Sequence, residues 1–306
     1  MQEVIDFAMD ETERHMRRRL TILLHNGGSI VIQADAPEEA IAFDGLGELL
    51  CRKPETDESA EAPDVELVEP GEMPEKRHVI RDTGLTEIAY MDNWSRILIA
   101  GWKKTPRRTH YYCCYVWQAA LICAGMNALL RGENAVLIHC AVLETVRGAV
   151  LIFGESGMGK STAFRRWHED GRKGFSDDMA LLDFSGDDGI HVRRMPTWSA
   201  CREEKNEWNY PANEELPLAG VLALGRSETG MDKITTLSPA QFFAQCYRSM
   251  FYWNLFYANN LPEEKQRFLT NRIRTQTEII AGMFPPRALL TVPEGSGLAE
   301  LIEEEL

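Results

Sequence analysis

The chain has 306 residues, 44% of them hydrophobic, which is enough to bury one large core or two smaller ones. Its formal net charge of −14 argues against general binding to nucleic acid or to an anionic membrane, because both need a cationic surface. Seven cysteines without a CxxC pair favour reduced thiols, and no signal-peptide pattern or apolar run near the ~20 residues of a membrane span is present. We therefore expect a globular cytoplasmic protein.

Residues 1–108 are predicted to form a β-rich N-terminal portion. Two apolar stretches within LTILLHNGGSIVIQA, residues 20–34, are separated by Asn-Gly-Gly, which is typical of a β-hairpin. Residues 36–50 look mixed or helical. Residues 53–76 are rich in Pro, Glu, Asp and Ala and indicate an acidic loop or linker. Strand patterns resume at HVIRD, EIAYM and RILIAGW.

Residues 109–306 are predicted to form a second, α/β domain. Residues 111–130 are apolar on most of a helical circumference and predict a buried helix that ends at Arg131-Gly132. Strand patterns follow at AVLIHCAVLE and, after a turn at Arg147-Gly148, at GAVLIF. The segment TAFRRWHEDG then predicts a helix that ends at Gly171, and GFSDDMALLDF contains another strand pattern.

Later segments continue the same alternation. IHVRRMPTWS and LAGVLALGR are further strand candidates, with turns expected at Pro211, Pro217 and Gly220. Ser238-Pro239 begins helical sequence that continues, with an interruption at residues 259–262, toward Met283.

Residues 154–161 read GESGMGKS, a full match to the phosphate-binding P-loop pattern between strand and helix patterns. Glycines free the backbone to turn several N–H groups toward one anion, Lys160 adds a positive charge, and Ser161 is placed to ligate Mg²⁺ at a helix N-terminus. The alternative is an ordinary Gly-rich turn, which would not need a strand pattern before it and a helix pattern after it. The sequence predicts ATP and Mg²⁺ as ligands, with nucleotide contacts from Gly154, Glu155, Ser156, Gly157, Met158, Gly159, Lys160, Ser161 and Thr162.

Three further residues are candidates for the chemistry. Asp177 and Asp178 precede the apolar run MALLDF, where carboxylates can complete a Mg²⁺ site or accept the proton of an attacking hydroxyl. The alternative is an aspartate pair that caps a turn. His139 lies in an apolar strand pattern, where a hydrogen-bonded core histidine is the alternative to a catalytic one.

The set IHCAVLE, GAVLIFGESGMGKST and FSDDMALL resembles the catalytic core of the HPr kinase/phosphorylase family. The resemblance is strong over about residues 134–184 and weaker up to the helix after Ser238. It implies an α/β core of the HPr kinase C-terminal type, shared with the nucleotide-binding part of phosphoenolpyruvate carboxykinase, beside the β-rich N-terminal portion. It also implies Asp177 as the base, Asp178 and Ser161 as metal ligands, and His139 beside the transferring phosphoryl group. More loosely aligned candidates are Arg194, Arg202, Glu203 and Glu204.

One family motif is missing. True HPr kinases carry a sequence of the form ExRGxG after the acidic pair, and VRRMPTWSACREEKNEW does not match it. HPr is therefore not the expected substrate. The chain more closely resembles HPr-kinase-related proteins that accompany small modified peptides, including kinases that phosphorylate a serine on a peptide tail.

The leading hypothesis is an ATP-dependent kinase that acts on a Ser or Thr hydroxyl of a peptide or small protein. Two alternatives remain: a non-catalytic nucleotide sensor or scaffold, and a small-molecule kinase or carboxykinase-like enzyme. The stretch from Tyr247 to Tyr257 is rich in aromatic residues, namely Tyr247, Phe251, Tyr252, Trp253, Phe256 and Tyr257. These either pack between helices or form a surface for a peptide or for another subunit of a homo-oligomer.

Overall fold

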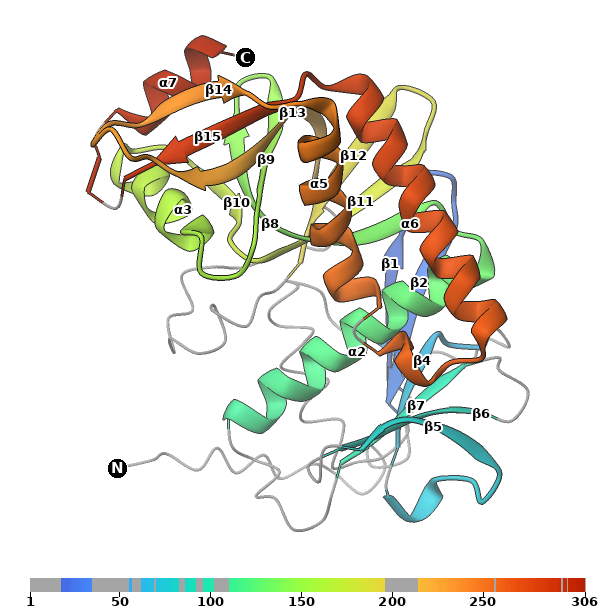
Figure 1. Ribbon diagram of the computed structural model, residues 1–306. Coiled ribbons are helices and arrows are strands. Elements are labelled where there is room, and N and C mark those ends of the chain that lie inside the picture. The colour runs from blue at the N-terminus through green and yellow to red at the C-terminus, as the bar shows by residue number, and fades with distance from the viewer. Residues whose placement is uncertain are drawn as a thin grey trace, which may run out of the picture.

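The computed structural model describes residues 18–34, 55–56, 62–68, 70–82, 86–91, 96–101, 110–195, 214–255, 257–292, 294–295 and 297–305. Within these residues the chain is mixed α/β, with two β-sheets and five α-helices (Figure 1). The stretch 36–50, which the sequence left open between helix and mixed structure, lies outside them.

The first sheet contains seven strands in the order β3-β1-β2-β4-β7-β6-β5. The predicted hairpin is confirmed, because β1 and β2 pair antiparallel around a turn in which Gly27 has a φ of 83°. The three later strand predictions are confirmed as β5, β6 and β7. The bounds are β1 (Arg18–Leu23), β2 (Ser29–Ala34), β3 (Glu55–Thr56), β4 (Val65–Val68), β5 (Arg77–Asp82), β6 (Thr86–Met91) and β7 (Ile97–Gly101).

The interpretation of residues 53–76 as a loop is wrong at its centre. Residues 65–68 form β4, which is buried throughout and pairs parallel with both β2 and β7, and a short 3-10 helix, η2 (Pro70–Glu72), follows it. The acidic residue inside β4 has a partner: buried Glu66 lies 3.0 Å from Arg96. A buried strand can thus contain a carboxylate when that carboxylate has a fixed partner, and the acidic composition of the segment did not indicate a strand.

Helix α2 (His110–Arg131) confirms the helix predicted at residues 111–130 and connects the two sheets. All residues from Ala119 to Leu129 are buried, and α2 contacts β2, β4 and β7 of the first sheet and β8 of the second. Near its C-terminus, Asn127 Nδ2 and Arg131 Nε lie 3.0 and 2.9 Å from Oδ1 of buried Asp64. The main hydrophobic core accordingly includes residues from both sheets.

The second sheet contains eight strands. Its main path is β10-β8-β11-β12-β13-β15-β14, and β9 lies between β8 and β13, antiparallel to the former and parallel to the latter. The strands predicted before and after the turn at Arg147-Gly148 are confirmed. The bounds are β8 (Ala135–Thr145), β9 (Gly148–Phe153), β10 (Gly174–Ser176), β11 (Met179–Gly186), β12 (Gly189–Arg194), β13 (Glu215–Arg226), β14 (Lys233–Thr236) and β15 (Arg287–Thr291).

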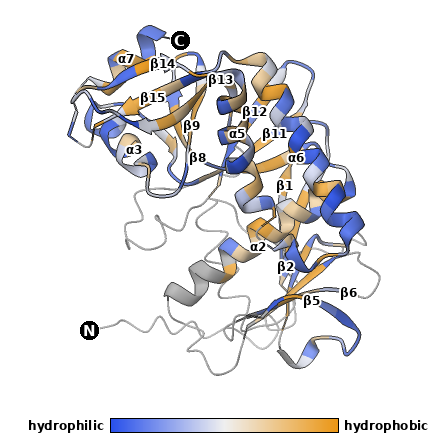
Figure 2. Ribbon diagram, in the orientation of Figure 1, coloured by the Kyte–Doolittle hydropathy of each residue, from blue (hydrophilic) through white to orange (hydrophobic). Residues whose placement is uncertain are grey.

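Helices cover both faces of this sheet. Successive residues of a strand point to opposite sides, so one strand packs against both layers of helices. On β9, Val150 and Ile152 join a cluster with α3 (Lys160–Glu169) and α7 (Leu298–Glu305). Leu151 and Phe153 face the main core, which includes residues of α5 (Pro239–Asn254) and α6 (Glu263–Met283). Figure 2 shows the corresponding concentration of hydrophobic residues on the strands.

The predicted C-terminal helices are confirmed as α5 and α6. Ser238 caps α5 through a reciprocal capping box with Gln241, and Pro239 occupies the first turn, where a missing N–H costs nothing. The predicted interruption contains a short 3-10 helix, η3 (Ala258–Asn260), before α6 begins at Glu263.

Two of the expected turns are instead part of β13. Pro217 pairs with His191 of β12, and Gly220 pairs with Val150 of β9 after a register shift beyond Leu218. The proline and glycine mark the point at which one long strand changes partner, which is where sheets tolerate these residues. The third expected turn, Pro211, lies outside the described residues.

Among the helices in the described part of the chain, none combines the length and the apolar character that crossing a membrane requires.

Candidate functional site

The segment Gly154–Ser161 connects the end of β9 to the start of α3. Gly157 and Gly159 have φ values of 79° and 103°, which side-chain-bearing residues rarely adopt, and Gly159 is the N-cap of α3. A Cβ on Gly154 would lie 3.3 Å from the Leu224 carbonyl oxygen, so the loop passes close to β13. Glu155, Ser156 and Ser161 are exposed. The three glycines thus hold an open loop at a helix N-terminus.

Lys160 is buried under this loop. Its exposed fraction is 6%, and its Nζ donates to the carbonyl oxygens of Gly154 and Glu155 at 2.9 and 3.1 Å. Burial lowers the pKa of Lys160, and the nearby Asp178 carboxylate partly offsets this effect. The ammonium group is therefore held between the loop and an acidic residue.

Asp177 and Asp178 form the turn between β10 and β11, as their position before MALLDF predicted. Ser176 Oγ donates to the Met179 carbonyl oxygen across this turn, and Cys140 N donates to the Asp178 carbonyl oxygen at 3.1 Å. The first bond closes the turn, and the second ties it to β8. Both aspartates are half-buried.

His139 lies on β8, beside the strand that leads into the loop. Its Nε2 is 3.1 Å from Asp178 Oδ1, and its side chain is 11% exposed. The neighbouring Cys140 and Phe153 are paired across β8 and β9. His139, Asp178 and Lys160 are therefore gathered around one end of β9, although the sequence separates His139 from Asp178 by a strand pair and a helix.

A pocket of about 310 Å³ opens between the loop and α5. The core side of the pocket consists of His139 and the first three loop residues, and the other side consists of α5 residues. The lining residues are His139, Gly154, Glu155, Ser156, Gln245, Arg248, Ser249, Phe251 and Tyr252.

Two arginines at the loop were not predicted from the sequence. Arg248 Nη1 on α5 lies 2.8 Å from Glu155 Oε1, and Arg226 Nη2 at the end of β13 lies 3.4 Å from the Gly157 carbonyl oxygen. Both are distant from the loop in sequence and match no motif. Since β13 is parallel to β9, its carboxyl end meets the same sheet edge, which is the one structural clue to Arg226.

The aromatic stretch contains residues that pack in the core as well as residues that form a surface, the two alternatives that the sequence left open. Trp253 and Tyr257 are buried at 7% and 4% exposure, whereas Phe251 and Tyr252 are 41% and 45% exposed and line the pocket. Tyr252 also lies over His139, with 5.1 Å between the ring centroids. Phe256 lies outside the described residues.

Of the more loosely aligned candidates, the structure describes Arg194, which is not at the loop. Arg194 on β12 lies 3.3 Å from Glu214 and 3.8 Å from Glu144, and its guanidinium stacks over Phe175. Its charge also lowers the pKa of His168, at the opposite end of α3, although burial of His168 is the larger cause. Arg202, Glu203 and Glu204 lie outside the described residues.

Comparison with known proteins gives one family. The model of the family described as SynChlorMet cassette protein ScmC matches residues 114–280, which is more than half of the chain. This segment includes His139, the Gly154–Ser161 loop, the aspartate pair and α5. A search of the curated proteins finds no match. The chain belongs to the ScmC family of SynChlorMet cassette proteins.

Proposed function

We propose that this protein transfers the terminal phosphoryl group of ATP to a Ser or Thr hydroxyl of a peptide or small protein, using an HPr-kinase-like nucleotide core. One observation carries the proposal: Lys160, Asp178 and His139 lie together where the glycine-rich loop meets the N-terminus of α3. Phosphoryl transfer requires a phosphate cradle, a metal site and a base for the acceptor. Lys160 belongs to the first and Asp178 to the second, and the adjacent Asp177 is available as the base.

The loop fits a triphosphate. The positive φ values at Gly157 and Gly159 suit backbone that turns its N–H groups toward an anion, and the α3 dipole adds positive potential at the same point. Lys160 is already inside the loop, bonded to carbonyl groups that a phosphate would replace. Ser161, Asp178 and the phosphates would hold Mg²⁺, which neutralises charge that develops during transfer.

Asp177 is the proposed base. When the acceptor oxygen forms its bond to the terminal phosphorus, the bond from that phosphorus to the bridging oxygen of ADP breaks, and the hydroxyl proton passes to the Asp177 carboxylate. His139 holds Asp178 in place through the 3.1 Å contact. The positively charged Lys160 remains on the phosphate side.

The pocket between the loop and α5 is the proposed entrance for the acceptor. Its volume of about 310 Å³ suits one side chain with its backbone, and the exposed rings of Phe251 and Tyr252 offer apolar contact. The family description names a cassette, and this fits an enzyme that acts on a peptide encoded by the same cassette.

The experiment is a transfer assay with Mg-ATP and each small peptide or protein of the cassette. We expect one phosphoryl group on a Ser or Thr of one of them, located by mass spectrometry, and no transfer with the Asp177→Asn variant. ATP binding without transfer to any cassette product would favour the nucleotide sensor. Transfer to a free amino acid or a sugar would favour the small-molecule kinase.

A further inference from the structure

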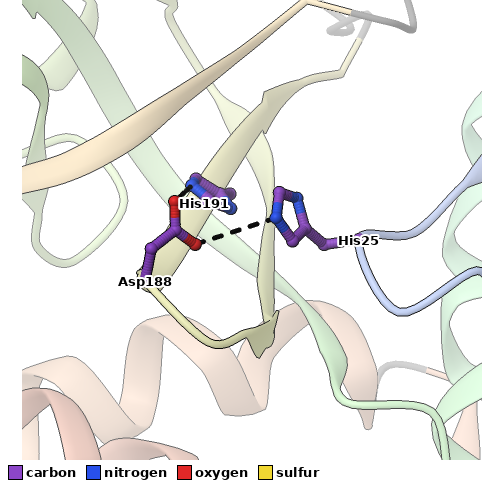
Figure 3. Close-up of side chains that lie close together, drawn as sticks. All are labelled: His25, Asp188 and His191. Carbon is purple, nitrogen blue, oxygen red and sulfur yellow. Dashed lines mark ion pairs between the residues drawn. The ribbon is translucent and has the colours of Figure 1, made fainter.

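A second cluster of ionisable side chains lies away from the loop, where the first sheet meets the second (Figure 3). His25 comes from the turn between β1 and β2, and Asp188 and His191 come from the β11–β12 hairpin. One ligand atom of each residue lies within 4.8 Å of the other two. Asp178 precedes the first residue of β11, and the cluster lies beyond the last. At the rise per residue of an extended strand, the two are roughly 25 Å apart, so the cluster is separate from the proposed nucleotide site.

Asp188 contacts both imidazoles from one side. Its Oδ1 is 3.7 Å from His25 Nε2, and its Oδ2 is 3.5 Å from His191 Nε2. These separations are longer than an ordinary hydrogen bond. Neighbouring ligands of a tetrahedral Zn²⁺ ion lie about 3.3–3.6 Å apart, given metal–ligand bonds of about 2.0–2.2 Å, so the Asp188–His191 distance falls in this range and the Asp188–His25 distance is slightly longer. The two rings face each other, with 4.3 Å between their centroids.

Glu215 stands behind His25. Its Oε1 lies 3.4 Å from His25 Nδ1, the ring nitrogen opposite the one that faces Asp188. A carboxylate behind a histidine ring is the usual arrangement around a metal-bound imidazole, because it fixes the ring and keeps the other nitrogen free to ligate. His25 is thus held with Nε2 toward the cluster.

His191 is the buried member of the cluster. It is 6% exposed, and its Nδ1 is buried without a hydrogen-bond partner among the residues that the structure describes. Its Nε2 faces Asp188. The Nε2–Oδ2 separation of 3.5 Å is one that an ion bound to both groups requires.

The backbone around the cluster is anchored. The carboxylate of fully buried Asp183 on β11 accepts from His25 N at 2.7 Å and from Ser185 N at 3.0 Å. Arg193 lies between Glu215 and Asp183, with Nη2 at 2.5 Å from Glu215 and Nε at 4.0 Å from Asp183. Asp183, Glu215 and Asp188 contribute three negative charges to this region against the one positive charge of Arg193, so the neighbourhood stays negative and favours a cation.

We propose that His25, Asp188 and His191 bind a divalent transition-metal ion of the Zn²⁺ type, with water completing the coordination. Two imidazoles and one carboxylate are a common ligand set for such ions. The ion links the β1–β2 turn of the first sheet to the β11–β12 hairpin of the second sheet and so stabilises the contact between the two sheets. This site requires no nucleotide.

Zn²⁺ titration of the metal-stripped full-length protein without nucleotide tests the proposal, by calorimetry together with metal analysis of the dialysed protein. We expect one ion per chain and at least a tenfold loss of affinity in His25→Gln and in Asp188→Asn. Both side chains are exposed, so these variants should fold. Glu215→Gln should weaken binding less, and His78→Gln and Asp187→Asn are the matched controls.

Hydrogen exchange tests whether the ion stabilises the contact between the two sheets. Zn²⁺ should slow hydrogen exchange in the β1–β2 turn of the wild type and leave the exchange of His25→Gln unchanged. Three results would overturn the proposal: no Zn²⁺ binding by the wild type, unaltered affinity in both ligand variants, or an equal loss in Asp187→Asn and Asp188→Asn. The last result would mean that overall charge, and not coordination, attracts the ion.

Discussion

His139 Nε2 lies 3.1 Å from Asp178 Oδ1, and the residue after His139 donates its backbone N–H to the Asp178 carbonyl oxygen. The side chain and the main chain of Asp178 are thus both tied to β8. Since β8 pairs with β9, the strand that ends at the glycine-rich loop, the position of the aspartate turn depends directly on the strand beside the loop.

The two aspartates should have separable roles. We expect Asp177→Asn to lose about a hundredfold or more of phosphoryl transfer while its affinity for Mg-ATP stays near that of the wild type, because a base acts on the acceptor and not on the nucleotide. Asp178→Asn should weaken nucleotide binding in Mg²⁺ and change it little in EDTA. Binding and single-turnover measurements on both variants check this, and identical profiles for the two variants would contradict it.

The glycine at the start of α3 should be needed for its conformation. Gly159 has a φ of 103°, so Gly159→Ala should lower the free energy of unfolding by about 1–2 kcal/mol and weaken ATP binding. Gly282 in α6 has no atom within 4 Å of an added Cβ, so Gly282→Ala should stabilise the protein by about 0.5–1 kcal/mol. Denaturant unfolding of both variants measures the contrast. Equal effects would show that the loop glycine has no special role.

Asn254 acts as a partner for the edge of β8. It is fully buried at the end of α5, accepts from Leu137 N at 3.4 Å, and donates to the carbonyl oxygens of Leu137 and Met250 at 2.6 Å each. Asn254→Ala would leave the buried N–H and carbonyl groups of Leu137 without this partner and should cost about 2–4 kcal/mol of unfolding free energy. Asn260→Ala, which removes one half-buried bond to the Ile80 carbonyl oxygen, should cost less. The reverse order would refute this account.

Asp64 should make stability depend on pH. Burial raises its pKa from 3.8 to about 6, against the opposing effect of Arg131. Because the pKa is higher in the folded state than in the unfolded state, the contribution of Asp64 is fully present below about pH 4 and is lost as the pH rises through about 6. Between pH 4 and 7 the wild type should lose on the order of 3 kcal/mol relative to Asp64→Asn. Unfolding of both proteins at several pH values tests this, and a constant difference would contradict it.

The elements with strong local patterns could be predicted from the sequence. The hairpin around residues 24–28 has a turn motif, α2 has an apolar circumference, and α5 has a capping box. By contrast, β4 has only four residues within an acidic stretch, and it is stabilised by β2 and β7, which lie elsewhere in the sequence. Pro217 and Gly220 were mistaken for turns because only the pairing of β13 with two different strands explains them.

The candidate site divides in the same way. His139, the loop and the aspartate pair lie within a stretch of sequence whose motifs have defined spacing, so their proximity could be expected. Arg226 and Arg248 reach the loop from other elements, and His25 meets His191 across more than half of the chain. No local pattern records such contacts, because tertiary packing alone brings the residues together.

Calorimetric binding of Mg-ATP to the wild type and to Lys160→Met tests the central claim most directly. Replacing Lys160 removes the buried ammonium group and leaves the loop glycines in place, and Lys233→Met on the exposed strand β14 is the matched control. We predict one ATP per chain for the wild type and for the control, and an affinity at least about tenfold lower for Lys160→Met. Absence of ATP binding in the wild type, or equal affinity in all three proteins, would contradict the assignment of this loop as a nucleotide site.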